Sequence, residues 1–279
     1  MRIISQINEL REHLTSVSQT KEIGFVPTMG ALHQGHISLI DQSNRENDFT
    51  VCSIFVNPAQ FNNATDFKKY PRHYEEDIAQ LKAVGVDCLF MPDADEMYPQ
   101  EMLYSFELGY LDKIMEGEFR SGHFGGVVTI ITKLFNIVRP TRAYFGQKDL
   151  QQLVVIQLLA TQFHFDVEVI SCPIIREETG LAMSSRNERL DQDDRLLASK
   201  LYKTLQLTAE AYQKHHKIEE AQKEGQIYLS KFSSIKLEYL EIVDANSLHQ
   251  ISEQTKEIAV CIAASIKSVR LIDNLVLTV

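Results

Sequence analysis

Short apolar runs alternate with segments of helical periodicity along the first part of the chain. The apolar runs, each read as a strand, are IGFV (23–26), TVCSIFV (50–56), VDCLFMP (86–92), AYFG (143–146) and DVEVISCPII (166–175). Apolar residues at helical spacing fall between them, over 37–46, 73–85, 125–140 and 149–163. Strands that alternate with helices and are apolar almost throughout predict a parallel sheet with helices on both faces.

One helix of this region shows both its buried stripe and its end. In HYEEDIAQLKAVG, Ile78, Leu81 and Val84 share one helical face, and Gly85 suits the position just after the last turn. The segment GGVVTIITKLFNIVRP is apolar on most sides and predicts a largely buried helix.

Beyond residue 175 the order of elements changes. Two amphipathic helices are predicted over 191–213 and 218–232, with Asp191 as the N-cap of the first. Three strand-like runs follow, over 236–244, 257–266 and 269–278. Helices followed by strands indicate a smaller α+β domain. We therefore expect two domains, 1–175 and 176–279.

Composition and charge narrow the class of protein. Of 279 residues, 44% are hydrophobic and 24% are charged, which is typical of a globular protein. Lys and Arg number 28 against 38 Asp and Glu, a net charge of −10. That balance argues against binding to a nucleic-acid backbone, although it allows a small basic pocket for one nucleotide.

The cysteines and the lengths of the apolar runs indicate the cellular compartment in which the protein is expected. Cys52, Cys88, Cys172 and Cys261 lie far apart without a CxxC spacing, which favours buried free thiols in a reducing environment. The N-terminal segment lacks the apolar core of a signal peptide, and no run is long enough to span a membrane. We expect a cytoplasmic protein with no membrane partner.

The stretch FVPTMGALHQGH (25–36) has the layout of a strand, a turn and a helix start. Ligands of open parallel sheets bind beyond the carboxyl ends of strands, where helix N-termini offer unpaired N–H groups. Gly30 and Gly35 permit close approach of the backbone, and His33 and His36 are donors for phosphate oxygens. A plain helix-start turn and a zinc site are the alternatives, although no further ligand has a familiar zinc spacing.

Four other polar clusters lie elsewhere in the chain. FGQKD offers Lys148 for a phosphate and Asp149 for ribose hydroxyls or Mg²⁺; GLAMSSRNERL offers Ser184, Ser185 and Arg186 as triphosphate donors. FVNPAQF supplies the amides of Asn57 and Gln60, and KKYPRHYEED supplies Tyr70, Arg72 and Asp77. FGQKD has a plainer interpretation as a surface turn with solvated charges, GLAMSSRNERL as an N-cap turn and KKYPRHYEED as an exposed charged face.

H-x-G-H is the pattern of the adenylyl-transferring superfamily. The accompanying stretches narrow the resemblance to one family within it. From residue 2 to residue 275 the chain resembles the pantothenate synthetase (pantoate–β-alanine ligase) family. The stretches that carry this resemblance are PTMGALHQGH, FVNPAQF, YPR, RSGHFGGV, KLFNIV, FGQKD, MSSRN and RLIDN. Ser121 is a small departure, since proline is common there in that family.

The resemblance implies a fold and a reaction. The fold is a Rossmann-like catalytic domain with a smaller α+β C-terminal domain that closes over it as a lid, in a homodimer. The reaction joins ATP, (R)-pantoate and β-alanine to give pantothenate, a coenzyme A precursor, with AMP and pyrophosphate, and it requires Mg²⁺. The intermediate is a pantoyl adenylate, because a carboxylate must gain a good leaving group before an amine can attack it.

The resemblance also implies roles for individual residues. The expected catalytic residues, with His36 as the usual proton donor, are His36, His33, Lys148, Ser184, Ser185 and Arg186. The expected ATP-binding residues are Met29, Gly30, Ala31, Leu32, His33, Gln34, Gly35, His36, Gly146, Gln147, Lys148, Asp149, Ile175, Met183, Ser184, Ser185 and Arg186. The expected substrate-binding residues are Gln60, Gln152, Pro27, Asn57 and Tyr70. Asp77 is a further pocket candidate. Mg²⁺ is expected to be held mainly by the phosphates, with Asp77 or Asp149 reaching it through water.

Other functions remain open at this level. Another H-x-G-H nucleotidyltransferase would need cations for a second phosphate, whereas the amides of NPAQF favour an uncharged polyol end. A tRNA synthetase conflicts with the acidic composition and leaves no room for an anticodon domain. An inert nucleotide-binding regulator conflicts with the intact donor set.

Overall fold

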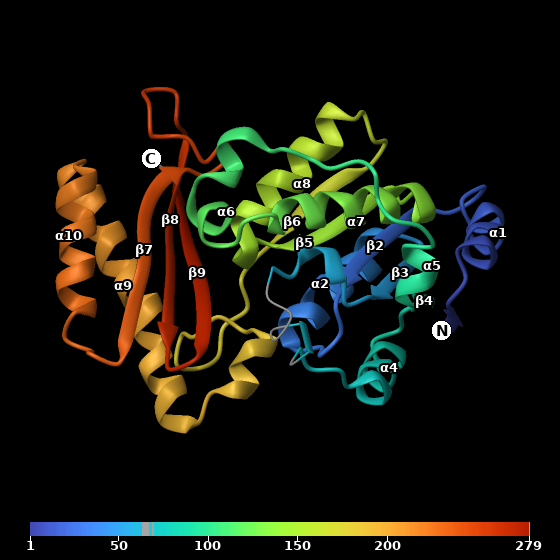
Figure 1. Cartoon of the computed structure of the whole chain (residues 1–279), viewed down its shortest axis with the longest axis horizontal. Coiled ribbons are helices and arrows are strands. Elements are labelled where there is room, and N and C mark those ends of the chain that lie inside the picture. Colours follow the sequence, from blue (N-terminus) through green and yellow to red (C-terminus); the bar gives the residue numbers. More distant parts are fainter. Residues whose placement is uncertain (63–66, 69, 279) are drawn as a thin grey trace. The chain divides into compact units, whose positions relative to one another are not determined.

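The computed structural model describes residues 1–62, 67–68 and 70–278 and contains two sheets (Figure 1). A six-stranded parallel sheet has the order β1-β4-β3-β2-β5-β6, and a three-stranded antiparallel sheet has the order β7-β8-β9. The strands of the first sheet are β1 Arg2–Ile4, β2 Ile23–Thr28, β3 Phe49–Ile54, β4 Cys88–Phe90, β5 Arg142–Gly146 and β6 Glu168–Cys172. Those of the second are β7 Ile235–Asp244, β8 Glu257–Ile266 and β9 Val269–Thr278.

Helices connect most of these strands. The helices are α1 Ile7–Val17, α2 Gln34–Glu46, α4 Tyr74–Ala83, α5 Ala94–Met97, α6 Met115–Phe119, α7 His123–Val138, α8 Leu150–Gln162, α9 Gln192–His215 and α10 Ile218–Leu229. Short 3₁₀ turns are η1 Pro58–Gln60, η2 Gly109–Asp112, η3 Gln147–Asp149 and η4 Ser185–Arg189. This architecture confirms the predicted α/β fold class with an additional α+β part.

The chain forms two compact units. The first comprises Met1–Gln147 and Val155–Pro173, and the second comprises Lys148–Val154 and Ile174–Val279. The start of α8 therefore groups with the second unit, although the helix is continuous.

The order of strands in the first unit reverses direction once. From β2 the chain steps outward to β3 and β4, whereas β5, on the other side of β2, is followed outward by β6. Right-handed connections place α2 and α4 on one face of the sheet and α1 and α7 on the other. The contacts of α1 with α7, and of α2 with β2, agree with this assignment. The reversal lies between β2 and β5, which is where open α/β sheets bind ligands.

The central strands form the core of the first unit because helices cover both of their faces. Every residue of β3 is buried, and β2 is buried except at Pro27. On the α2 side, Leu39 and Ile40 pack in one cluster with Leu81 of α4 and Leu89 of β4. Gly85 has a positive φ of 80° directly after Val84, the C-cap of α4, which confirms its predicted place at the helix end.

Two elements at the N-terminus were not predicted. β1 is three residues long with one buried side chain, Ile4, and α1 buries only Leu10 and Leu14. Such short or sparse apolar patterns resemble an exposed loop in the sequence. They add an edge strand and a covering helix without changing the fold class.

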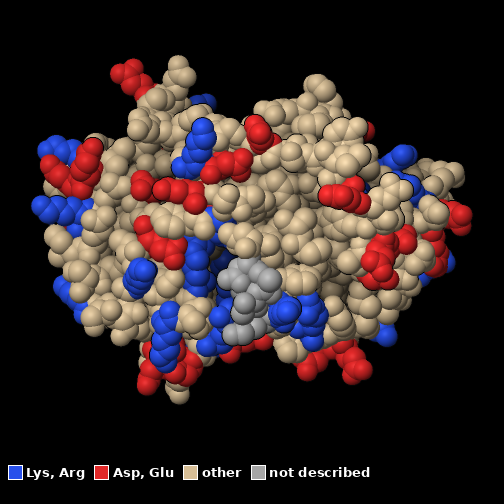
Figure 2. Space-filling view, viewed as in Figure 1, with Lys and Arg blue, Asp and Glu red and all other residues tan. Residues whose placement is uncertain are grey.

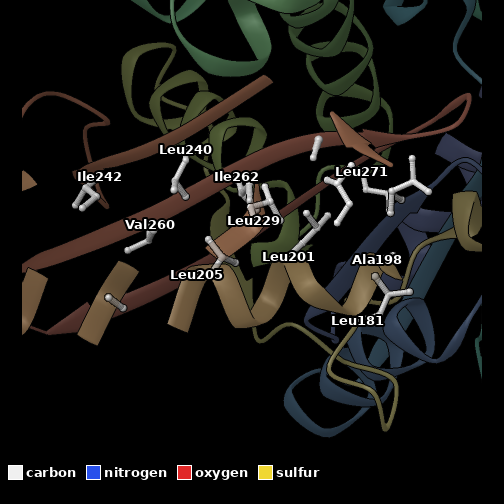
Figure 3. Close-up of a cluster of buried hydrophobic side chains, with 14 of the residues drawn as sticks. Leu181, Ala198, Leu201, Leu205, Leu229, Leu240, Ile242, Val260, Ile262 and Leu271 are labelled. Atoms are coloured by element: carbon white, nitrogen blue, oxygen red, sulfur yellow. The ribbon is translucent and has the colours of Figure 1, made fainter. Parts of the chain in front are cut away.

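The second unit packs α9 and α10 on one face of its antiparallel sheet. Figure 3 shows Leu201 and Leu205 of α9 directed into the cluster that contains Leu229 of α10 and Ile262 of β8. Asp191 caps α9 by accepting the backbone N–H of Asp194 at 2.8 Å, as predicted.

Candidate active site

The carboxyl ends of β2 and β5 separate at the point where the strand order reverses. The two strands pair only through Gly24 with Arg142 and Phe25 with Ala143, whereas β2 pairs with β3 along its full length. The carbonyl of Ile23 accepts an N–H from the β5 side, so alternate residues place Pro27 on that side as well. Proline has no N–H to continue the ladder. Pro27 therefore ends the pairing at the switch point, where open α/β sheets bind ligands.

The turn after β2 is held in an uncommon backbone conformation. Gly30 and Ala31 have φ angles of 78° and 50°, both in the left-handed region. Thr28 Oγ1 accepts the N–H of Gly30 at 3.2 Å and donates to the carbonyl of Ser53 at 2.8 Å. The carboxylate of Asp77 accepts the N–H groups of Ala31 and Leu32, at 2.9 and 2.8 Å. Three consecutive N–H groups of the turn are thus bonded to side chains.

His33 and His36 cap the start of α2 reciprocally. His33 Nδ1 accepts the N–H of Gly35 at 3.1 Å, and His36 Nδ1 accepts the N–H of His33 at 3.3 Å. The ring centroids lie 4.1 Å apart. Because each Nδ1 acts as an acceptor, a neutral ring carries its proton on Nε2. The caps therefore place an Nε2–H donor on each ring beside a helix N-terminus.

The NPAQ turn fixes the side chain of Gln60. Asn57 caps η1 by accepting the N–H of Ala59 at 3.3 Å and donates to Gln60 Oε1 at 3.1 Å. Gln60 Nε2 donates to Met29 Sδ at 3.1 Å, and the residue is only 8% exposed. The structure thus joins two predicted site segments, the turn after β2 and the NPAQ turn.

Helix α7 supports the same turn from its first residues. His123 Nδ1 lies 2.8 Å from the carbonyl oxygen of Gln60, and Asn57 also donates to the carbonyl of Gly126 at 3.1 Å. A side chain at Gly126 would overlap the backbone of Ala59, so only glycine allows this close packing. Tyr98 donates to Asn57 Oδ1 at 2.7 Å. The amide of Gln60 is therefore preorganised.

Tyr70 lies beside this turn, whereas Arg72 does not enter it. The Tyr70 ring is buried and meets Phe61, the residue after Gln60, edge to face at 5.8 Å. Arg72 stacks over Phe67 at 5.3 Å and is exposed.

In the second unit, a small hairpin brings two predicted nucleotide-binding segments together. The N–H of Met183 donates to the carbonyl of Ile175 at 2.9 Å, and Arg176 pairs with Ala182. Ser184 then caps η4 by accepting the N–H of Arg186 at 3.2 Å. Backbone hydrogen bonds therefore bring Ile175 next to the start of the Met183–Arg186 segment.

Lys148 and Asp149 begin the second unit after β5. Lys148 Nζ lies 3.9 Å from Asp149 Oδ1, and the Asp149 side chain is 49% exposed. The carbonyl of Lys148 accepts from Asn274 Nδ2 at 3.0 Å. Gln152 is half-buried in the first turn of α8.

The predicted site residues form two sets, one in each unit. The first unit holds Pro27, Met29–His36, Asn57, Gln60, Tyr70, Gly146 and Gln147. The second unit holds Lys148, Asp149, Gln152, Ile175 and Met183–Arg186.

Charge, metal and membrane features add little to this description. Both basic and acidic side chains are scattered over the face shown in Figure 2. Over residues 1–62, 67–68 and 70–278, no group of three or more His, Cys, Asp or Glu is placed to hold a metal ion. No helix in these ranges is both long and apolar enough to cross a membrane.

Several supporting residues were missed from the sequence. His123 stands in the RSGHFGGV stretch and Asn274 in RLIDN, but neither stretch was given a role beyond the resemblance. Asp77 was expected as a pocket candidate or a contact to Mg²⁺ through water, within a charge run, and not as a support for the turn; it is 1% exposed. All three bind backbone groups, and residue types in a sequence do not identify such partners.

An open parallel sheet with an H-x-G-H turn at its switch point defines a nucleotide-binding domain of the adenylyl-transferring type. The family model "Pantoate-beta-alanine ligase" matches residues 2–276. The chain therefore belongs to the pantoate–β-alanine ligase family.

Individual relatives agree with this assignment along nearly the whole chain. Pantothenate synthetase of Cytophaga hutchinsonii is 51% identical over 98% of this chain and 98% of its own length. The Thermus thermophilus pantothenate synthetase structure has a TM-score of 0.92 and 41% identity, covering 99% of both chains. The ligase of Francisella tularensis, solved with beta-gamma ATP and beta-alanine, has a TM-score of 0.82 and 36% identity, covering 99% of this chain and 97% of its own.

Proposed function

We propose that this chain makes pantothenate in two chemical steps through a pantoyl adenylate. As a family member, the chain is an ATP-dependent ligase of pantoate and β-alanine. The observation that carries the stepwise mechanism is the pair of Nε2–H donors at the switch point, because they suit charge that develops on phosphoryl oxygens.

In the first step, a carboxylate oxygen of pantoate attacks the α-phosphorus of ATP. The bond from the α-phosphorus to the bridging oxygen breaks, and pyrophosphate leaves. The β-alanine amine then attacks the acyl carbon, AMP leaves with the carboxyl oxygen, and the amine loses its proton. No covalent bond to the protein is needed.

The chain's own residues divide between binding and charge stabilisation. His33 and His36 donate to phosphoryl oxygens, with His36 as proton donor, and Lys148, Ser184, Ser185 and Arg186 bind the triphosphate. The preorganised amide of Gln60 binds the polar groups of pantoate and β-alanine, with Pro27, Asn57, Tyr70 and Gln152 around the substrates. Met29–His36, Gly146–Asp149, Ile175 and Met183 bind the rest of ATP.

Mg²⁺ neutralises phosphate charge when it is bound. The donor set fits an ion held mainly by the phosphates, because Mg²⁺ keeps several waters and uses few carboxylates. Asp149, half-exposed, is the side chain suited to reach the ion through water.

The resemblance further supports a homodimer in the cytoplasm, in which the C-terminal domain 176–279 closes as a lid over the catalytic domain 1–175. These three expectations stay predictions. Light scattering coupled to gel filtration measures the oligomeric state directly, and a monomer mass would contradict the first of them.

The stepwise mechanism is tested by mixing the purified chain with ATP, Mg²⁺ and pantoate. Pyrophosphate should form in a burst stoichiometric with enzyme when β-alanine is absent, and turn over continuously when it is present. Pyrophosphate formation only when β-alanine is present would contradict a free-standing adenylation step.

A further inference from the structure

Asp77 lies in the first turn of α4, and its carboxylate is buried against the turn that precedes His33. Oδ2 accepts the N–H of Ala31 at 2.9 Å and Oδ1 accepts the N–H of Leu32 at 2.8 Å. The residue is 1% exposed. Both oxygens of a buried carboxylate therefore bind consecutive backbone donors of the nucleotide-binding turn.

That turn needs an external support. A left-handed conformation is unfavourable for alanine, and Ala31 adopts a φ of 50°. Charge-assisted bonds from two N–H groups to one carboxylate are among the stronger hydrogen bonds in proteins. A Cβ at Gly30 would lie 2.9 Å from Asp77 Oδ2, so glycine is the residue that fits beside the carboxylate.

The support is transmitted to the histidines through a short, bonded path. The N–H of Leu32 is bonded to Asp77, and the next residue, His33, is both N-cap of α2 and acceptor for Gly35. Its N–H is in turn held by His36 Nδ1. A shift of the turn would therefore move both rings together.

We propose that Asp77 is a positioning residue for adenylate formation, which holds the His33–His36 turn in its reactive shape and is not a ligand of Mg²⁺. This proposal rests on the proposed function. The carboxylate is buried, and both of its oxygens accept backbone hydrogen bonds, whereas Mg²⁺ in such sites keeps waters and needs access to them.

The test compares Asp77→Asn with Asp87→Asn. Asp87 Oδ2 accepts the N–H of Thr50 at 2.8 Å, so it makes the same type of carboxylate-to-backbone bond, before β4 at the amino ends of the strands. Asp77→Asn should slow pyrophosphate release from ATP and pantoate by about 10-fold to 100-fold, since small misplacements of reacting groups have effects of this size. Its KM for β-alanine should stay unchanged, and Asp87→Asn should keep the wild-type rate.

Two further measurements separate positioning from metal binding. Raising Mg²⁺ should not restore the rate of Asp77→Asn; full recovery at high Mg²⁺ would overturn the proposal. Amide hydrogen exchange, without nucleotide or metal, should show Ala31 and Leu32 protected in the wild type and faster in Asp77→Asn. Equal slowing by Asp87→Asn would also overturn it, because the loss would then be a general structural one.

Thr28→Val provides an independent variant if Asp77→Asn does not fold. It removes the bond to the N–H of Gly30 in the same turn and has no capacity to bind a metal. Slowed adenylate formation in Thr28→Val supports the proposal, and a wild-type rate overturns it. A wild-type enzyme that releases no pyrophosphate before β-alanine is added would instead contradict the stepwise function and leave the exchange result intact.

Discussion

Asn274 in the last strand donates from its side chain to the backbone carbonyl of Lys148 at 3.0 Å, across 126 positions of sequence. Its neighbour Asp273 binds Arg176, at the start of the hairpin that pairs Ile175 with Met183. Two adjacent residues of β9 therefore support both predicted nucleotide-binding segments of the second unit. This relationship gives a physical reason for the RLIDN stretch, which carries no reactive group of its own.

Asn274→Ala should raise the KM for ATP several-fold with little effect on the KM for β-alanine. The change removes the hydrogen bond to the carbonyl of Lys148, so the backbone of a lysine that we propose binds phosphate loses this support. Steady-state kinetics with each substrate varied in turn measures this. Asn136→Ala is the matched control, because Asn136 donates to the carbonyl of Thr132 at an exposed site. An unchanged KM for ATP in Asn274→Ala would contradict the supporting role.

The pair of Arg176 and Asp273 should contribute strongly to the stability of the second unit. The guanidinium donates to both carboxylate oxygens, at 2.6 and 3.0 Å, and stacks 3.8 Å from the Tyr202 ring centroid. Burial raises the pKa of Asp273, and Arg176 opposes that rise. Removing one partner of a buried pair leaves the other unpaired, which costs about 3–5 kcal/mol.

Urea unfolding of Arg176→Met and of Asp273→Leu should each show a loss of that size. The double variant Arg176→Met with Asp273→Leu should be more stable than either single variant, because neither charge is then left buried alone. Strictly additive losses would contradict the coupling.

The sequence was informative where side chains alone determine the structure. β2, β3 and β5 were predicted because burial on both faces makes them largely apolar, and the H-x-G-H and NPAQ turns were recognised by their side-chain types. The N-terminal β1 and α1 were missed because they bury few residues.

The supporting contacts of the site could not be read in the same way. The partners of Asp77 are the N–H groups of Ala31 and Leu32, and the partner of Asn274 is a carbonyl. Every residue has a backbone carbonyl and every residue except proline has an N–H, so no spacing of residue types identifies which of these groups a side chain will meet. Asp77 stood in a run of acidic residues, where an exposed helix face was the simpler interpretation.

The four cysteines should be unreactive in the folded protein. All four are free and buried, as predicted. Burial raises the pKa of Cys88 to about 11 and that of Cys172 to about 12, and it raises the pKa of Cys52 further. At pH 8 only about one Cys88 thiol in 1,000 would be a thiolate. A thiol reagent should therefore label the native protein slowly and all four cysteines in guanidinium; rapid native labelling of any one would contradict this.

Asp191 should make the stability of the second unit dependent on acid pH. The N–H of Asp194 and the ammonium of Lys267 hold the pKa of the Asp191 carboxyl below its usual value. Its contribution is therefore fully present above the unfolded pKa of about 4 and is lost as the pH falls through the lower folded value. Asp191→Asn keeps a capping oxygen but loses the charge.

The difference in urea midpoint between wild type and Asp191→Asn should be present at pH 7 and disappear as the pH is lowered below the folded pKa. Asp193→Asn controls for the change in net charge, because Asp193 lies in the same first turn without capping it. A midpoint difference that is independent of pH would show that the charge of Asp191 does not act as described.

His36 offers the most direct test of the proposed chemistry, provided that its two nitrogens are separated. Nδ1 caps α2 by accepting the N–H of His33, whereas the proposed donor is Nε2. Asparagine places an oxygen near the position of Nδ1 and has nothing at Nε2, whereas glutamine places an amide nitrogen near Nε2. His36→Asn should keep the cap and the unfolding midpoint yet slow pyrophosphate release by about 10²–10³-fold, the usual loss for one charge-stabilising donor. His36→Gln should retain more of the rate because its amide can still donate. Quench-flow of the first step measures both, and a near-wild-type rate in His36→Asn would remove His36 from the chemistry.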